Sequence, residues 1–201
     1  MLARPIMAAR ATGLFERIYV STEDAEIAEI AKQYGADVIE RPPQIAEDRS
    51  TVVQVCLHAL ETHPEINLMC CVYATAVLLA PETIAAAHKL LGGEPKADFV
   101  MGVSEYEYPP VQALKAGDND YLTYMWPEWR GIQSQFHPHL VVSNGTFYWA
   151  RRQALLEEKT FYGRRLLGAT VPSEQVSDLD TREDLARVIS RLSDKHKPVG
   201  T

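Results

Sequence analysis

The sequence predicts one α/β domain built around a mainly parallel sheet with helices on both faces, and three observations lead to this prediction. Short apolar stretches alternate in the first half with amphipathic stretches of about 10 to 14 residues, the rhythm of strand–helix–strand units. Residues 67–72 form a nearly unbroken apolar run, as expected of a strand buried on both faces. The chain has 201 residues, 46% of them hydrophobic, enough to bury one substantial core. A sheet of this kind places ligands at the carboxyl ends of its strands.

Helix and strand patterns alternate from the first residues onward. Residues 6–14 are amphipathic, and residues 17–21 form a short apolar strand. Thr22 is placed to cap a helix that ends at Gly35, where a left-handed backbone conformation is expected. A brief strand at 36–39 follows, which completes the first strand–helix–strand unit.

The next units repeat this order. Asp48 or Ser50 is expected to cap a helix that leads into the unbroken apolar run. Pro81 suits the first turn of a further helix over residues 82–91, because proline at that position loses no helical hydrogen bond. Residues 98–103 then read as another strand.

The alternation of predicted strands and helices stops between residues 104 and 161, where most of the aromatic residues lie. Residues 118–120 are typical of a hairpin turn, with strands expected in 111–115 and 121–125. An insertion this aromatic is not a plain solvent loop. It either covers a pocket or packs against another subunit.

The composition of the chain indicates which binding partners, which compartment and which enzyme classes are expected. The net charge of -7 argues against nucleic acid or an anionic membrane surface as the main partner, because such surfaces need clustered cations. No apolar run approaches the roughly 20 residues that span a bilayer, so we expect a soluble protein. Cys56, Cys70 and Cys71 lie in apolar runs and are expected to be buried reduced thiols, which favours the cytoplasm. The glycine-rich motifs of dinucleotide oxidoreductases and P-loop ATPases and the serine motif of α/β-hydrolases do not occur.

Asp178 and Asp180 are the first candidate site residues. They come at the end of a predicted strand over residues 175–178, where residues two apart share a face, so both carboxylates suit a hard cation such as Mg²⁺. An alternative is helix capping, since the spacing of Thr181 and Asp184 resembles a capping box at the start of the final helix, 182–192. Both interpretations are compatible.

Other candidates are less specific. Arg41, followed by two prolines, either binds a phosphate or base or is an exposed loop charge. Small residues around 73–76 either let a ligand approach the backbone or form a tight connection. His58, His137 and His139 invite a metal interpretation, but packing or surface roles are favoured.

Several motifs resemble the acylneuraminate cytidylyltransferase (CMP-sialic acid synthetase-like) family. They are GLFERIYVSTEDAEIA at 13–28, YGADV at 34–38 with Arg-Pro at 41–42, CCVYATA at 70–76, FYW at 147–149 and VSDLDTRED at 176–184. The motifs occur in order over nearly the whole chain and are most similar to the pseudaminic acid branch.

The resemblance implies a single three-layer, Rossmann-like domain over residues 1–201, of the nucleotide-diphospho-sugar transferase type, whose segment 104–161 is a dimerisation arm. It implies a cytoplasmic homodimer that joins CTP to a nine-carbon acidic sugar of the sialic, pseudaminic or legionaminic kind. The products would be pyrophosphate and a CMP-sugar for surface glycan or flagellin glycosylation. The implied residues are Asp178 and Asp180 for Mg²⁺ and catalysis, Arg41, Thr51, Tyr73 and Thr75 for the nucleotide, and Gln135, Asn144, Gly145 and Tyr148 for the sugar.

The sequence departs from the family pattern in two places. Family members begin with a strand and an Ala-Arg-Gly-Gly-Ser-Lys-type phosphate loop, and residues 1–3 align just after that loop. Since this strand is central, we expect open, apolar strand edges here. The arginine that often precedes the glutamine at 135 is missing from Ile132-Gln-Ser-Gln135, and Arg130 is a possible substitute.

Three functions follow as hypotheses. The first is a Mg²⁺-dependent cytidylyltransferase acting on a nonulosonic acid. The second is a non-catalytic relative that binds a nucleotide or sugar or serves as a partner subunit. The third is a sugar nucleotidyltransferase that uses another base.

Overall fold

The computed structural model describes residues 1–47, 49–177 and 179–194. Its strands are β1 (Tyr19–Thr22), β2 (Asp37–Glu40), β3 (Leu68–Val72), β4 (Phe99–Glu105), β5 (Leu114–Ala116), β6 (Leu122–Tyr124), β7 (Val141–Arg151) and β8 (Leu166–Thr170). Its α-helices are α1 (Ala3–Ala11), α2 (Ala25–Gln33), α3 (Val52–Thr62), α4 (Pro81–Leu90), α5 (Arg152–Glu158) and α6 (Arg182–Asp194). Short 3-10 turns are η1 (Pro43–Ile45), η2 (Pro110–Gln112), η3 (Pro127–Trp129), η4 (Ser134–Phe136) and η5 (Ser173–Gln175).

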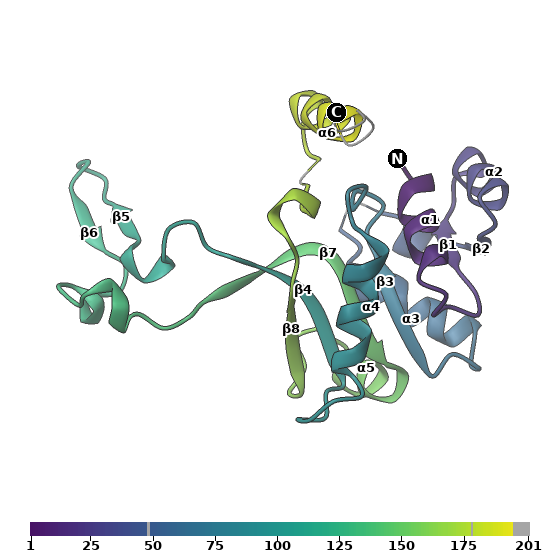
Figure 1. The fold of residues 1–201 in the computed structure, drawn as a ribbon, viewed down its shortest axis with the longest axis horizontal. Helices are drawn as coiled ribbons and strands as arrows, with labels where there is room; N and C mark the ends of the chain where they lie inside the picture. Colours follow the sequence, from purple (N-terminus) through teal and green to yellow (C-terminus); the bar gives the residue numbers. More distant parts are fainter. Residues whose placement is uncertain (48, 178, 195–201) are drawn as a thin grey trace, which may run out of the picture.

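The main sheet has the strand order β3-β7-β4-β8 (Figure 1). β4 and β8 pair in parallel, whereas β7 lies antiparallel between β3 and β4. β3, β4 and β8 therefore run in one direction, and β7 alone among them runs in the other. β1 and β2 form a separate parallel pair. The prediction of a mainly parallel sheet is confirmed.

Helices cover both faces of the main sheet, as Figure 1 shows. Because successive strand residues point to opposite faces, Phe147 and Trp149 of β7 pack under α4 and α1, while Tyr148 packs toward α3 and α5. Phe147 is fully buried and Trp149 nearly so. The predicted three-layer arrangement follows from this alternation.

Two strand edges are open within the described part of the chain. Among the described residues, β1 has a ladder partner only on the side of β2, and β3 only on the side of β7. All five residues of β3 are half-buried, whereas Phe99–Val103 of β4 are buried throughout. A strand with the apolar sequence of a central strand thus lies at an edge.

The predicted helix ends are correct within a few residues, with two corrections. Gly35 adopts the expected left-handed conformation, with φ of 78°. Asp24, and not Thr22, caps α2, because its carboxylate reaches the amides of residues 26 and 27 at 2.8 and 2.9 Å. Thr51, and not Ser50, caps α3 through a capping box with Gln54; Asp48 lies outside the described residues. Pro81 opens α4 as predicted.

The second half differs more from the prediction. Residues 175–177 form no strand, because Gln175 closes the turn η5 and the amides of Gln175 and Val176 donate within that turn, at 2.8 and 3.3 Å. β7 and β8 were not predicted from the sequence. Since β7 lies inside the sheet, the segment outside the sheet is narrower than 104–161. We call residues 106–140 the arm, which carries the β5–β6 hairpin with its predicted turn and projects from the sheet (Figure 1).

Candidate functional site

The carboxyl ends of β3, β4 and β8 lie at the same end of the main sheet, beside the first half of β7; we call this the carboxyl edge. Val72 of β3 lies opposite Phe147 of β7, and Val103 of β4 lies beside Thr170 of β8. The segments that follow these strands are therefore neighbours. Most of the candidate residues lie at this edge.

The turn after β3 carries Tyr73 and Thr75. The amide of Tyr73 donates to the carbonyl of Thr146 in β7 at 3.0 Å, which fixes the start of the turn. The hydroxyl of Ser177 donates to the carbonyl of Thr75, also at 3.0 Å. The turn is therefore attached to β7 at one end and to the segment after β8 at the other.

Tyr73 and Tyr148 form the centre of an aromatic group. Their ring centroids lie 5.9 Å apart, and Tyr148 also stacks on Phe161 at 4.7 Å. The hydroxyls of Tyr148 and Ser143 lie 2.8 Å apart, and Tyr148 is only 7% exposed. Burial raises the pKa of Tyr73 well above its usual value, and the neighbouring Tyr148 adds to the effect. Tyr148 is therefore the buried ring that packs against Tyr73, and Tyr73 is the more accessible ring of the two.

Asn144 and Gly145 form an irregularity in β7, where the register with β4 shifts. The Asn144 amide nitrogen donates to the hydroxyl of Ser104 at 3.0 Å, and its oxygen accepts from the Thr146 hydroxyl at 2.6 Å. Gly145 has a φ of 65°, which favours glycine. The side chain of Asn144 is thus occupied by bonds within the protein.

Gly102 of β4 leaves room for the side chains of Asn144 and Thr146. This role of Gly102 was not predicted from the sequence. A Cβ atom at Gly102 would lie 2.4 Å from the Thr146 hydroxyl oxygen and 2.9 Å from the Asn144 side-chain oxygen. The signal in the sequence is a glycine inside an otherwise apolar strand, which often marks a bulge or a close approach.

Arg41 and Thr51 lie beyond β2, on the side of the β1–β2 pair. The Arg41 guanidinium donates to the hydroxyl oxygen of Ser21 at 3.3 Å and to its carbonyl, and it lies 3.8 Å from the Glu23 carboxylate. The Arg41 guanidinium is therefore partly occupied by contacts with Ser21 and Glu23 at the end of β1, and it is not a free loop charge. The hydroxyl of Thr51 accepts from the amide of Gln54 at 3.3 Å as part of the helix cap.

Asp178 lies outside the described residues, and Asp180 is exposed just before α6. The capping alternative is confirmed, because Thr181 and Asp184 exchange bonds of 2.9 and 3.2 Å. Hydrogen bonds from Thr181, followed by the nearby charge of Arg187, lower the pKa of Asp184. Asp180 forms no ion pair with any residue that the structure describes, nor does that part of the chain hold a group of three or more metal-binding side chains.

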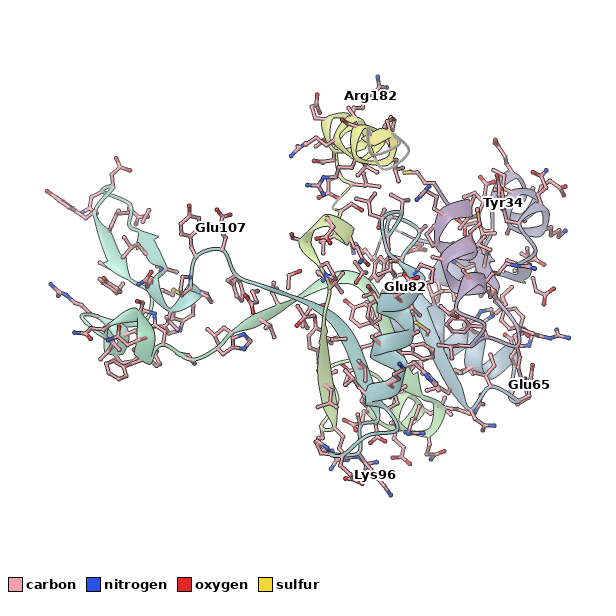
Figure 2. All side chains as sticks on the ribbon, viewed as in Figure 1. Tyr34, Glu65, Glu82, Lys96, Glu107 and Arg182 are labelled. Atoms are coloured by element: carbon pink, nitrogen blue, oxygen red, sulfur yellow. The ribbon has the colours of Figure 1, made fainter. Side chains whose placement is uncertain are left out.

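Gln135 lies in the arm, and its side-chain nitrogen donates to Gln133 at 2.6 Å. Figure 2 shows Glu107 on the arm, well separated from Glu82 at the start of α4. Gln135 lies in η4, within the arm that projects from the main sheet (Figure 1), whereas Asn144 and Tyr148 lie in β7 of that sheet. Arg130, the possible substitute for the missing arginine, is also in the arm.

The histidines make local contacts. His137 lies edge-on to Trp129 at 5.8 Å, and His139 lies 3.3 Å from Glu105. His58 is in α3. A hollow of about 470 Å³ lies at the opposite end of β3, and none of the candidate residues lines it; its lining residues are Leu68, His88, Lys89, Leu91, Gly92, Gly93 and Arg151.

Among the described residues, no helix combines the length and apolar character needed to cross a membrane.

Comparison with known proteins gives a consistent picture. A family model described as cytidylyltransferase matches residues 1–185. The pseudaminic acid cytidylyltransferase of Campylobacter jejuni serotype O:2 is 30% identical over 191 residues, which cover 90% of this chain and 81% of that protein. The N-acylneuraminate cytidylyltransferase of Escherichia coli O18:K1:H7 is 27% identical over 205 residues, 98% of this chain and 47% of the relative.

Two solved structures share the fold. One is a CMP:2-keto-3-deoxy-manno-octonic acid synthetase complexed with CTP, with a TM-score of 0.64. The other is the 4-diphosphocytidyl-2C-methyl-D-erythritol synthase of Anaerococcus prevotii, with a TM-score of 0.66. In each case the sequence identity is 10%, and the match covers 96% of this chain and 88% of the other. At this identity the similarity concerns the fold.

Proposed function

Because the chain belongs to the cytidylyltransferase family, we propose that it transfers CMP from CTP to a nonulosonic acid of the sialic, pseudaminic or legionaminic type. The observation that supports this most is the family match over residues 1–185, together with a relative 30% identical over most of both chains. The products are a CMP-sugar and pyrophosphate.

In this reaction a sugar hydroxyl oxygen attacks the α-phosphorus of CTP. A new P–O bond forms, the bond from the α-phosphorus to the bridging oxygen breaks, and pyrophosphate leaves with that electron pair. The hydroxyl proton is lost to the surroundings. Since negative charge gathers on phosphate oxygens, the protein acts mainly by positioning the reactants and by supplying compensating charge.

We assign the nucleotide to the turn after β3. Tyr73 and Thr75 would form the floor of the nucleotide site, and Arg41 and Thr51 would lie near the cytosine base. The support is their position, because Tyr73 and Thr75 follow the carboxyl end of a strand, where ligands bind in sheets of this class. Hydrogen bonds to Ser21 hold the guanidinium of Arg41 near the end of β2.

The sugar is assigned to the β7 side of the same edge. Asn144 and Tyr148 would shape this pocket through side chains that are held by bonds within the protein, and Gly145 through its left-handed backbone conformation. Gln135 would reach a sugar only in the site of a second copy, because it lies in the arm.

Asp178 and Asp180 would hold Mg²⁺. Asp180 fits this assignment, because its carboxylate is exposed and makes no ion pair with the described residues. Magnesium in such sites needs one or two carboxylates and takes its other oxygens from water and phosphate. When bound, the ion would supply positive charge beside the phosphate oxygens.

We also propose a homodimer formed through the arm. Large apolar side chains of the arm are exposed, among them Tyr108 at 78% and Tyr121 at 73%. Such a surface is typical of a subunit interface. The free cysteines of the chain support the cytoplasm as its compartment.

The test is pyrophosphate release from CTP with pseudaminic, legionaminic or sialic acid, compared with ATP, GTP and UTP. Asp180→Ala and Asp178→Ala should each lower kcat by roughly a hundredfold or more, because phosphoryl transfer depends on charge compensation. Glu183→Gln, a nearby exposed carboxylate on α6, is the matched control. Full activity of both aspartate variants would remove the metal role, and a preference for another base would make the chain a different sugar nucleotidyltransferase.

A second candidate is a non-catalytic relative that binds a nucleotide or sugar or acts as a partner subunit. The strand edges of β1 and β3 that are open among the described residues favour it, because β3, which leads into the nucleotide turn, has a ladder partner there only on the side of β7. Calorimetry with CTP, CMP and free sugar separates the two candidates. Tight CTP binding with pyrophosphate release excludes the second.

A further inference from the structure

The segment between β8 and α6 binds along the loop between β3 and α4. The side-chain oxygen of Gln175 accepts from the amide of Ala80 at 2.9 Å and from the hydroxyl of Thr83 at 2.8 Å. Ser177 donates to the carbonyl of Thr75 at 3.0 Å. Three hydrogen bonds thus join segments about a hundred residues apart in the sequence.

Apolar contacts accompany these bonds. Val176 packs against the core beneath α4, and Leu179 packs with Val77 and Leu78. Apolar and polar side chains of this segment therefore both face the loop. We call this set of contacts the clamp.

Gln175 supplies one half of a capping box to α4, because it accepts from the amide of the N-cap residue as the side chain at the third helical position does in such a box. Ala80 is the N-cap residue of α4 and has no side chain that could accept a hydrogen bond from the first turn. Gln175 supplies an acceptor for the Ala80 amide and for Thr83 in that turn. The start of α4 therefore depends on a residue from the other end of the chain.

Ser177 acts on the turn itself. The carbonyl of Thr75 accepts from the Val77 amide at 2.8 Å as well as from Ser177. The residues on either side of Thr75 are alanines, which offer no side-chain bond that could fix this peptide. Since β3 has no ladder partner on the side of β1 among the described residues, the clamp is a main lateral support of the turn.

We propose that Gln175 and Ser177 are positioning residues, which hold the Tyr73–Thr75 turn in the shape that receives the nucleotide. This inference rests on the proposed function of that turn. Gln175 and Ser177 act through Thr75 and the start of α4, and they do not themselves contact the substrate.

The experiment uses two disrupting variants, two conservative variants and a control in the full chain. Ser177→Ala and Gln175→Met remove the hydrogen bonds. Ser177→Thr keeps the hydroxyl, and Gln175→Glu keeps an acceptor at the helix start. Ser173→Ala changes an exposed side chain in the same segment that makes no side-chain hydrogen bond with the residues that the structure describes.

Each disrupting variant should raise the KM for CTP and the calorimetric dissociation constant for CTP by roughly threefold to tenfold, the effect of one or two lost hydrogen bonds. kcat should change by less than about twofold, because binding is lost equally in ground and transition states. The conservative variants should recover at least half of the lost affinity on a logarithmic scale. Hydrogen exchange at the Ala80 amide should become faster in Gln175→Met.

Two results would overturn the proposal. One is CTP affinity unchanged in both disrupting variants, even if their melting temperatures fall, because the clamp would then be structural only. The other is a wild-type chain that binds no CTP, which would refute the proposed function as well. The wild-type measurement alone distinguishes these two failures.

Discussion

The main sheet and the arm use the same kinds of residue in opposite ways. In the sheet, Phe147 and Trp149 are 0% and 2% exposed, enclosed between helices. In the arm, Tyr108 and Phe136 are 78% and 69% exposed. Aromatic content by itself therefore does not distinguish a core from an exposed surface.

The difference lies in what surrounds each region. β5 and β6 are three residues long and pair only with each other among the described residues. A two-stranded hairpin of this size is marginally stable alone in water. The arm is thus stabilised little by its own contacts, which is consistent with the proposed dimer, whereas the sheet is stabilised by its own helices.

The largest expected effect is a core truncation. Phe147→Ala should lower the free energy of unfolding by about 3–5 kcal/mol, because it leaves a cavity in a fully enclosed position. Phe136→Ala, the matched change in the arm, should cost less than about 1 kcal/mol in dilute protein. Urea unfolding of both variants measures the contrast. Equal losses would show that the arm has a core of its own.

The next effect is on assembly. Leu122→Arg places a charge on the exposed hairpin and should weaken the proposed dimer by roughly a hundredfold, about 3 kcal/mol. Light scattering over a concentration series measures it. Tyr162→Arg, at an exposed position outside the arm, is the control and should leave the mass unchanged. If both variants match the wild type, the arm is not the interface.

A smaller effect is expected at Gly102, where β4 and β7 approach each other closely. Gly102→Ala should destabilise the protein by about 1–3 kcal/mol, because its Cβ would crowd Thr146 and Asn144. Gly92→Ala has room, with the nearest atom at 3.8 Å, and should change stability by no more than about 0.5 kcal/mol. Thermal unfolding compares them, and indistinguishable melting temperatures would contradict a close approach at Gly102.

The smallest effect concerns alkaline pH. Burial raises the pKa of Tyr73 in the folded chain, so the unfolded chain loses this proton first as the pH rises. The contribution is present below the unfolded pKa of about 10 and decreases as the pH rises above it. Tyr73→Phe should therefore flatten the decline of stability above that pH, measured as the urea midpoint at several pH values. An unchanged decline, equal to that of a Tyr162→Phe control, would contradict this account.

Local patterns predicted the first half of the fold well. Gly35 fixes its helix end through backbone geometry that no distant contact needs to supply. Pro81 marks the start of α4 locally, and the long-range bonds of Gln175 are added to it. Caps were predicted less accurately, since Asp24 and Thr51 replaced neighbouring residues of similar chemistry. Several polar residues in a row offer alternative caps, and packing selects between them.

The second half could not be predicted in this way. β7 looked like part of an aromatic insertion, because its pairing with β3 and β4 is long-range. Residues 175–177 looked like a strand, but Gln175 and Ser177 bond to the loop before α4. In the site, the bonds that occupy Asn144 and Tyr148 depend on Ser104 and Ser143, which carry no local signal.

The sequence by itself determined the class of fold, the family and most helix ends, since these depend on periodicity, motif order and local backbone geometry. Tertiary structure decided which apolar segments are core and which are exposed, and which polar side chains are already occupied within the protein. The physical reason is that burial and long-range hydrogen bonding belong to pairs of distant residues, so neither is encoded in any one stretch of the chain.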